Sequence, residues 1–242
     1  MAKSDFVASD VHLGAVPRET EREFLRFLEH VGANAAQLLL PGDLFDFWFE
    51  WGRLVEGKHF RVLAALAALV DAGVPVTMIG GNHDAWGGRF LREEVGIAFS
   101  PGMRRMRFGG RETLVAHGDG VGVGDIKYRM LKAAIRSRAA IVGFRLLHPE
   151  LGLRLAHWVS TTEAKAEDDP RDQGRARQIE AWALEVLAAE PALELVICGH
   201  SHLPVLLEVS PGRWYLNSGD WVRNRSYAVV AEGAAPRLLE WR

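Results

Sequence analysis

Five short apolar runs in the sequence each end in side chains that can bind a metal ion. The endings are Asp10-Val11-His12, Gly42-Asp43-Leu44-Phe45-Asp46, Gly81-Asn82-His83-Asp84, His117-Gly118-Asp119 and Gly199-His200-Ser201-His202. An apolar run that stops at glycine and an acid is typical of a buried strand that opens at the edge of an α/β sheet, where such folds place their chemistry. The repeated pattern therefore predicts an α/β protein whose functional residues lie at the ends of its strands.

The length and composition fit a globular enzyme and exclude several other classes of protein. The 242 residues are enough for one large core, or for a core with an insertion. The net charge of -2 gives no overall reason to bind nucleic acid, so nucleic acid is not expected as a partner. Cys198 is the only cysteine, which excludes an intrachain disulfide framework. With no visible signal peptide and no apolar stretch of about 20 residues, we expect a cytoplasmic enzyme.

Hydrophobic periodicity predicts a sheet-forming chain with one helical interruption. Strands are expected at 6–8, 37–40, 74–79, 103–108, 111–116, 195–198, 205–209, 214–216, 227–230 and 238–241. Helices are expected at 24–31, behind a capping-box pair at Thr20 and Glu23, and at 59–71, 126–147, 151–166 and 175–189. We therefore expect residues 1–120 and 191–242 to form the core, and residues 121–190 to form a helical cap inserted within the same domain.

The expected cap is both basic and apolar. Between Asp125 and Lys165 there are eight lysines or arginines and three acids, interspersed with isoleucine, leucine, valine and tryptophan. This combination suits an anionic ligand that carries lipid, or a membrane surface. An ordinary helical subdomain with a solvated basic face has the same composition, and composition alone does not separate the two.

Seven of the side chains at the strand ends are candidate metal ligands. They are Asp10, His12, Asp43, Asn82, His117, His200 and His202. Seven ligands exceed the four of one tetrahedral ion and suit two divalent ions that share a carboxylate. A mixture of carboxylate, amide and imidazole without thiolate favours Mn²⁺ over a structural Zn²⁺. Each motif alone also fits a surface turn or a capping loop, so the prediction depends on the order and context of all five.

In that order and spacing the motifs resemble those of the calcineurin-like metallophosphoesterases, over the chain from Asp10 to His202 apart from the insertion. The resemblance implies a four-layer α/β/β/α sandwich with two metal ions at the strand ends. It implies one ion held by Asp10, His12, Asp43 and His202, and a second held by Asp43, Asn82, His117 and His200. A hydroxide shared by both ions would attack phosphorus. His83, oriented by Asp84, would act as the catalytic group that stabilises the developing charge or protonates the leaving oxygen. Asp46 is spaced to orient a neighbouring ligand or to cap the turn.

A narrower resemblance is to the UDP-2,3-diacylglucosamine pyrophosphatases of lipid A synthesis. It is carried by residues 42–48, by Asp125 and Tyr128 beyond His117, and by residues 217–221. That subfamily cleaves its substrate to UMP and 2,3-diacylglucosamine 1-phosphate, which implies a nucleotide-linked lipid as partner and possible peripheral contact with the inner membrane. The substrate-binding residues implied are Asn82, His83, Asp125, Tyr128 and Ser160.

Two departures from the subfamily keep other functions open. Many members carry arginine where this chain has His83, and Ala164 and Glu167 stand where an amide and a lysine are usual. Histidine at that position is what the broader phosphodiesterases use, so a general phosphodiesterase acting on cyclic nucleotides or nucleic acid is the first alternative. A non-catalytic scaffold of the same fold is the second, and it predicts missing ligands, although none of the seven is missing.

Overall fold

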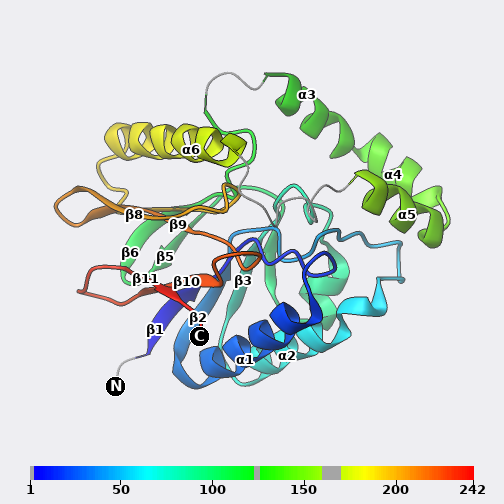
Figure 1. The fold of residues 1–242 in the computed structure, drawn as a ribbon, viewed down its shortest axis with the longest axis horizontal. Coiled ribbons are helices and arrows are strands. Elements are labelled where there is room, and N and C mark those ends of the chain that lie inside the picture. The colour runs from blue at the N-terminus through cyan, green and yellow to red at the C-terminus, as the bar shows by residue number, and fades with distance from the viewer. Residues whose placement is uncertain (1–2, 123–125, 160–169) are drawn as a thin grey trace.

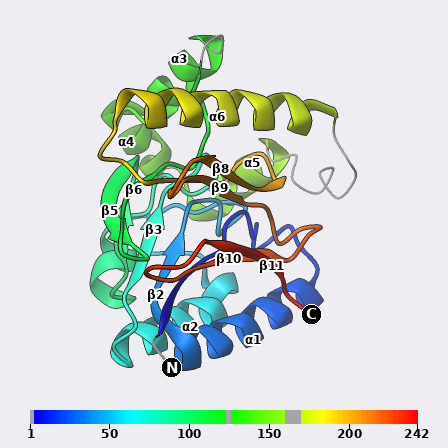
Figure 2. The ribbon, with the colours of Figure 1, turned by 90° about the vertical axis from the view of Figure 1, so that its left-hand side faces the viewer.

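The computed structural model of the chain describes residues 3–122, 126–159 and 170–242. Two β-sheets lie face to face, and helices cover the outer face of each (Figure 1). Viewed along the sheets, the four layers are α6, one sheet, the second sheet, and the pair α1 and α2 (Figure 2). The four-layer α/β/β/α order implied by the family resemblance is therefore present.

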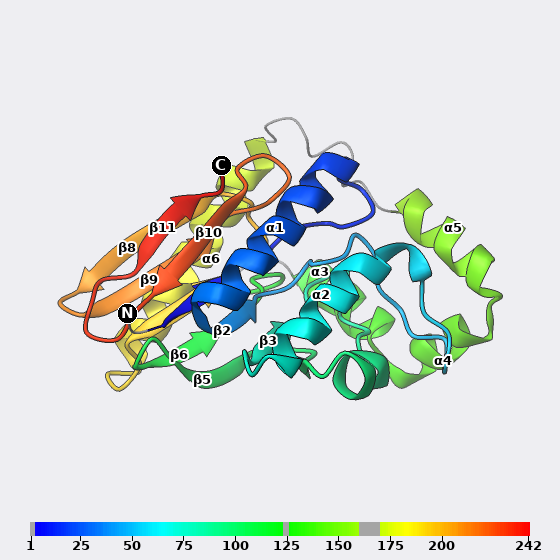
Figure 3. The same ribbon diagram turned by 90° about the horizontal axis from the view of Figure 1, so that it is seen from below.

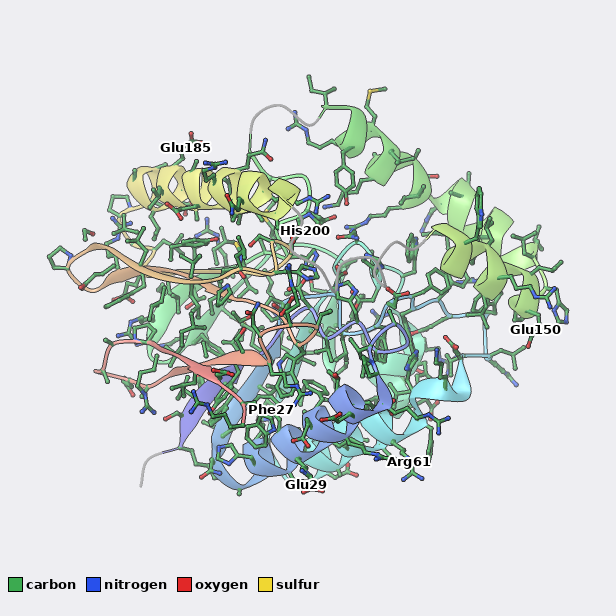
Figure 4. The ribbon with its side chains drawn as sticks, viewed as in Figure 1. Phe27, Glu29, Arg61, Glu150, Glu185 and His200 are labelled. Carbon is green, nitrogen blue, oxygen red and sulfur yellow. The ribbon has the colours of Figure 1, made fainter. Side chains whose placement is uncertain are left out.

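The first sheet contains the chain's βαβ units. Its strand order is β11(Arg237–Glu240), β10(Ser226–Val230), β1(Ser4–Val7), β2(Ala35–Leu40), β3(Val76–Ile79) and β4(Ala98–Ser100). The strands from β1 to β4 are parallel, and α1(Arg18–Asn34) and α2(Phe60–Asp71) cross over on the outer face. Phe27 projects from α1 into the apolar layer beneath this sheet (Figure 4). Parallel strands bring their carboxyl ends to one edge, which is where the motifs follow.

The second sheet has the order β5(Arg104–Phe108), β6(Arg111–Val115), β7(Leu195–Cys198), β9(Arg213–Ser218) and β8(Pro204–Ser210). The predicted hairpin is confirmed, because β5 and β6 pair antiparallel with Phe108 opposite Arg111 across Gly109-Gly110. Strands β6 and β7 are parallel, so His117 and His200 leave the sheet at the same edge.

A buried apolar layer joins the two sheets. Val7, Leu39 and Ile79 of the first sheet pack with Val115, Ile197 and Leu216 of the second, and none of these side chains reaches the solvent. Close packing of this kind resists relative movement of the sheets. The two sets of strand ends therefore keep a fixed separation, which a site built from both sheets requires.

The inserted segment divides into two parts. Helix α3(Ile126–Ile135) leads from the middle of the molecule to α4(Arg138–Leu146) and α5(Pro149–Val159), which lie at one end (Figures 1 and 3). Helix α6(Pro170–Ala189) instead packs on the second sheet through Ile179, Ala183 and Leu187, which are buried there. We propose that α3 to α5 form the cap and that α6 belongs to the core, which shortens the expected cap range of 121–190 at its C-terminal end.

Other differences from the expected elements have local causes. The helix expected over 126–147 is two helices, because the Ser137 hydroxyl accepts a bond from the Ala140 N–H at 3.2 Å and starts α4. The capping-box prediction at Thr20 is wrong, since α1 already begins at Arg18 after Pro17. Three short elements were not predicted: strand β4, the 3₁₀ helix η1(Gly57–His59) and the π-helix η2(Phe90–Glu94). Each is too short to give a periodic hydrophobic signal.

Candidate active site

The five motifs meet between the ends of the two sheets. Strands β1, β2 and β3 lead to Asp10, Asp43 and Asn82, and strands β6 and β7 lead to His117 and His200. His200 lies near the middle of the molecule, below α6 (Figure 4). Residues that are almost two hundred positions apart are in contact here, since the His200 N–H donates to both carboxylate oxygens of Asp10 at 3.0 and 3.1 Å.

The backbone at this edge is strained. Six non-glycine residues in the described parts of the chain have left-handed φ angles: Asp10 (53°), His12 (49°), Asp43 (51°), His200 (68°), His202 (61°) and Arg225 (45°). Five of the six are candidate ligands. Such conformations cost about 1–3 kcal/mol each and persist where the surrounding structure fixes them, most often at functional sites.

Glycines beside the ligands leave the space that the ligands fill. A side chain at Gly42 would collide with the His117 imidazole, one at Gly81 with the Asp43 carboxylate, and one at Gly199 with the Asp10 carboxylate. The glycine in each motif is therefore explained by the close approach of a neighbouring motif. Substitution at any of the three would displace a candidate ligand.

One group of side chains that could hold an ion contains Asp10, His12 and His202. The Nε2 atoms of His12 and His202 are 3.3 Å apart, and the Nε2 of His202 is 3.6 Å from Asp10 Oδ1. All three side chains are almost completely buried. Their nitrogen and oxygen atoms converge on one small space.

A second group contains Asp43, His117 and His200, and Asp43 also forms a group with His12 and His83. The Nε2 of His117 lies 3.2 Å from Asp43 Oδ2 and 3.3 Å from Asn82 Oδ1. The same Asp43 oxygen lies 3.9 Å from His12 Nε2 in the first group. Asp43 therefore lies between the two groups, as a carboxylate shared by two ions would.

Outer partners orient the imidazoles. The Nδ1 of His117 donates to the Pro41 carbonyl at 2.8 Å, which leaves its Nε2 without a proton in the neutral ring and turned inward. The Nδ1 of His202 bonds Asp220 Oδ2 at 3.0 Å, and that of His12 lies 3.6 Å from Asp46 Oδ1. Histidines that bind metals are oriented in this way, so the three imidazoles are suited to bind metal ions.

The buried carboxylates of the site oppose one another's ionisation. Burial, followed by the neighbouring Asp43 carboxylate, raises the pKa of Asp84 to about 7. Burial also raises the pKa of Asp10. Burial lowers the pKa of His117, but the charge of Asp43 outweighs burial and raises that pKa to about 10. Buried carboxylates that hold protons in this way fit a site built for divalent cations.

His83 and Asp84 have different roles in the geometry. The Nδ1 of His83 bonds the Asp46 carbonyl at 2.7 Å and lies 3.7 Å from its carboxylate. Asp84, which the family resemblance gave as the orienting group of His83, instead accepts from the backbone N–H groups of residues 43, 44, 45 and 81. Asp46 therefore orients His83, while Asp84 fixes the loop that carries Asp43.

The expected substrate-binding residues are only partly described. Asp125 and Ser160 lie outside the described residues. The Tyr128 hydroxyl donates to Asp119 Oδ2 at 3.2 Å, and the same buried carboxylate is 2.8 Å from Lys132 Nζ and 3.2 Å from Arg136 Nη2. Asp119 therefore anchors α3 to the core beside the candidate ligands.

A cavity of about 560 Å³ opens from the metal-ligand groups toward the cap. Asn82, His83 and His200 line its polar end. The opposite walls are largely apolar and include Phe47, Trp86, Ile135, Ile141, Phe144 and Leu155. The size is in the range of ligand pockets, and the two ends suit a molecule with an ionic and an apolar part.

Two residues in this region were not assigned a role from the sequence. Asp220 was noted only as part of residues 217–221, yet its carboxylate holds His202. Arg175 lines the cavity but stands after the basic stretch that drew attention to residues 125–165. The acid after Gly219 could have indicated Asp220, whereas no pattern in the sequence indicates that Arg175 reaches the cavity.

Comparisons with known proteins agree with this geometry. The family profile described as calcineurin-like phosphoesterase matches residues 6–204. The chain is 30% identical to a UDP-2,3-diacylglucosamine hydrolase of Stenotrophomonas maltophilia over 93% of this chain and 94% of the relative, and 28% identical to one of Porphyromonas gingivalis over 95% and 94%. A dimetal phosphatase from Danio rerio has a similar structure, with a TM-score of 0.51 and 11% identity, covering 99% of both chains.

Proposed function

We propose that this chain, which belongs to the calcineurin-like phosphoesterase family, is a metal-dependent hydrolase that cleaves the diphosphate of UDP-2,3-diacylglucosamine to UMP and 2,3-diacylglucosamine 1-phosphate. The relatives that match almost the whole chain carry the name of that hydrolase. The observation that carries the proposal is the cavity, because the candidate ligands Asn82 and His200 line one end together with His83, and the other end is apolar.

Two divalent ions suit the ligand groups, and we propose Mn²⁺ because the donors are carboxylate, amide and imidazole. Asp43 would bind both ions. The first ion would also be held by Asp10, His12 and His202, and the second by Asn82, His117 and His200. When bound, the ions would activate water and neutralise charge on the phosphate oxygens. The chain's own part is to hold these side chains in a strained, buried frame before any ion arrives.

His83 is the proposed catalytic group. With its Nδ1 fixed by the Asp46 carbonyl, its Nε2 is the atom available to the substrate, and His83 lines the cavity. In the protonated form Nε2 donates to a phosphate oxygen or to the leaving oxygen as the bond to phosphorus breaks. Asp84 contributes by fixing the backbone of residues 43–45, and so the position of Asp43.

The apolar walls of the cavity are the proposed site for the acyl chains. Phe144 and Leu155 come from the cap, whereas Phe47 comes from the loop after β2, so the chains would lie between cap and core. The outer surface of the cap exposes further apolar side chains, including Leu146 and Trp158, beside exposed Arg145 and Arg154. We propose that this surface touches the anionic face of the inner membrane. No helix in the described residues has the length and hydropathy to cross a bilayer.

The test is hydrolysis of UDP-2,3-diacylglucosamine with Mn²⁺, followed by phosphorus-31 NMR of the products. We expect UMP and 2,3-diacylglucosamine 1-phosphate in equal amounts, and no product after chelation. Release of UDP, or no turnover in a preparation that hydrolyses bis(4-nitrophenyl) phosphate, would contradict the proposed substrate.

A general phosphodiesterase is the second candidate. His83 favours it, because many members of the subfamily resembled here carry arginine at that position. Rates on bis(4-nitrophenyl) phosphate that equal those on the lipid nucleotide would support this alternative.

A further inference from the structure

One positively charged side chain lines the cavity and has no role in the proposed reaction so far. Among the described residues that line it, Arg175 is the only lysine or arginine. The cap cations Lys132 and Arg136 are instead paired with Asp119. Arg175 shares the cavity with Asn82 and His200, two candidate metal ligands. A substrate anion that enters this cavity therefore meets the ions and Arg175.

Asp172 orients Arg175. The Nη1 of Arg175 donates to Asp172 Oδ1 at 3.1 Å, one helical turn earlier in α6. Asp172 is only 3% exposed, whereas the Arg175 side chain is 37% exposed. A guanidinium has five N–H donors, so one bond to a fixed carboxylate sets its direction and leaves donors for an anion.

Arg223 connects this pair to the metal-ligand groups. Its Nη2 donates to Asp172 Oδ2 at 3.0 Å, and its Nε lies 3.4 Å from Asp220 Oδ2. Asp220 in turn bonds His202 Nδ1 at 3.0 Å. Asp172 and Asp220 are both buried, and a buried carboxylate requires a cation or hydrogen-bond donors beside it. The result is a row of alternating charge from the cavity wall to His202.

We propose that Arg175 is a substrate-binding residue that receives a phosphate oxygen of the substrate, and that Asp172 and Arg223 are positioning residues that fix Arg175 relative to His202. The inference rests on the proposed function for the identity of the substrate, but applies to any phosphodiester in this site. A phosphate that binds both to the metal-ligand groups and to Arg175 requires that the two lie at a fixed distance from each other. Packing of α6 on the second sheet supplies part of that rigidity, and the charged row supplies the rest.

The first experiment compares Arg175→Gln with Arg177→Gln, which removes the same charge from an exposed position on the same helix. Loss of a charge-assisted bond to phosphate raises KM about 10- to 100-fold. We expect this rise for Arg175→Gln with kcat within about threefold, while Arg177→Gln behaves as the wild type. Elemental analysis should find the same metal content in all three proteins. An unchanged KM in Arg175→Gln would overturn the assignment.

The second experiment separates positioning from mere stability. Asp172→Asn should raise KM about 3- to 10-fold with unchanged metal content, because Arg175 loses its orienting carboxylate while Arg223 keeps its bond to Asp220. Arg223→Ala should raise KM and also weaken metal binding by about 10-fold through Asp220 and His202, and Arg223→Lys should restore part of both. A merely structural role would lower the melting temperature and kcat and leave KM unchanged, which would contradict the proposal.

Each kinetic experiment is run on UDP-2,3-diacylglucosamine and on bis(4-nitrophenyl) phosphate. Wild-type activity on the second compound alone would refute the proposed function, while the KM of Arg175→Gln on that compound would still decide the role of Arg175. Isothermal titration of inorganic phosphate into the Mn²⁺-loaded proteins gives a readout without turnover. We expect weaker phosphate binding in Arg175→Gln than in Arg177→Gln, and equal binding would overturn the assignment.

Discussion

The edge where the strands end and the cap above it are built in opposite ways. At the edge, Asp10, His12 and Asp43 are buried and their backbone is strained. In the cap, Leu146 of α4 and Trp158 of α5 are each 83% exposed, and both of these segments are ordinary α-helix. The contrast indicates that the chain fixes the candidate metal-binding edge before substrate arrives, whereas the cap exposes apolar side chains that we propose meet the membrane.

Ion pairs and aromatic contacts join the two regions. Asp119 pairs with Lys132 of α3 and with Arg136 just after it, and Phe144 of α4 packs edge-on against Phe49 and at a tilt against Trp51 of the core. Glu150 of α5 lies at the far end of the molecule from the sheets (Figure 4). Substitutions at the edge should therefore abolish hydrolysis. Substitutions on the outer cap should affect only the turnover of substrate that lies in a membrane.

The largest effect is expected at Asp43. Asp43→Ala removes the carboxylate that lies between the two ligand groups, so both ions and at least about 1,000-fold of kcat should be lost together. Elemental analysis and steady-state kinetics on the same preparation check this. Asp71→Ala, at an exposed acid at the end of α2, is the control. Retention of both ions by Asp43→Ala would refute the shared carboxylate.

His83→Ala should separate chemistry from metal binding. The ring lines the cavity and is held by Asp46, so its loss should cost about 100- to 1,000-fold in kcat while both ions remain. His30→Ala, at an exposed position on α1, serves as the control. Metal loss equal to that of Asp43→Ala would remove His83 from its catalytic role.

The charge balance at the edge predicts a pH effect. Burial opposes a charge on His117, but Asp43 outweighs burial and raises the pKa of His117 from 6.5 to about 10. Because the folded state binds this proton more tightly, its stabilising contribution is complete below pH 6.5 and is lost as the pH rises to about 10. Urea denaturation of chelator-treated protein should show this decline, and Mn²⁺ should reduce it because the ion replaces the proton. A rising profile without metal would contradict this account.

The smallest effect is expected on the outer cap. Trp158→Ser should reduce turnover of vesicle-bound substrate about 3- to 10-fold, because one exposed ring no longer enters the bilayer surface. Turnover of bis(4-nitrophenyl) phosphate should not change. Leu207→Ser, at an exposed apolar position on β8, is the matched control. Equal loss on both substrates would show that Trp158 affects the site itself and not the lipid surface.

The sequence was most informative where strands end in polar motifs. Asp10, Asp43 and His200 follow apolar runs within three residues, and each run is a strand whose end lies at the common edge. The sequence pattern did not indicate which side chains contact each other in the folded chain. The orienting group of His83 is Asp46, because the loop after β2 folds back over the third motif.

The cap and its junction were less predictable for a physical reason. Composition separated the helical insertion from the strands, but α6 has an apolar face like any packed helix, and only the sheet it covers shows that it belongs to the core. Arg175 was missed because a single arginine in a helix has no distinctive pattern. Its environment, with Asp172 beside it and the cavity ahead, exists only in the folded chain.

The most direct test of the account is the ratio of kcat/KM for UDP-2,3-diacylglucosamine to kcat/KM for bis(4-nitrophenyl) phosphate. Both compounds need the metal-ligand edge, but only the lipid nucleotide can use the apolar walls of the cavity. We predict a ratio above about 100, since binding energy from the remote part of a substrate supports its turnover. A ratio of one or less would contradict the assignment of the cavity to a lipid-bearing diphosphate.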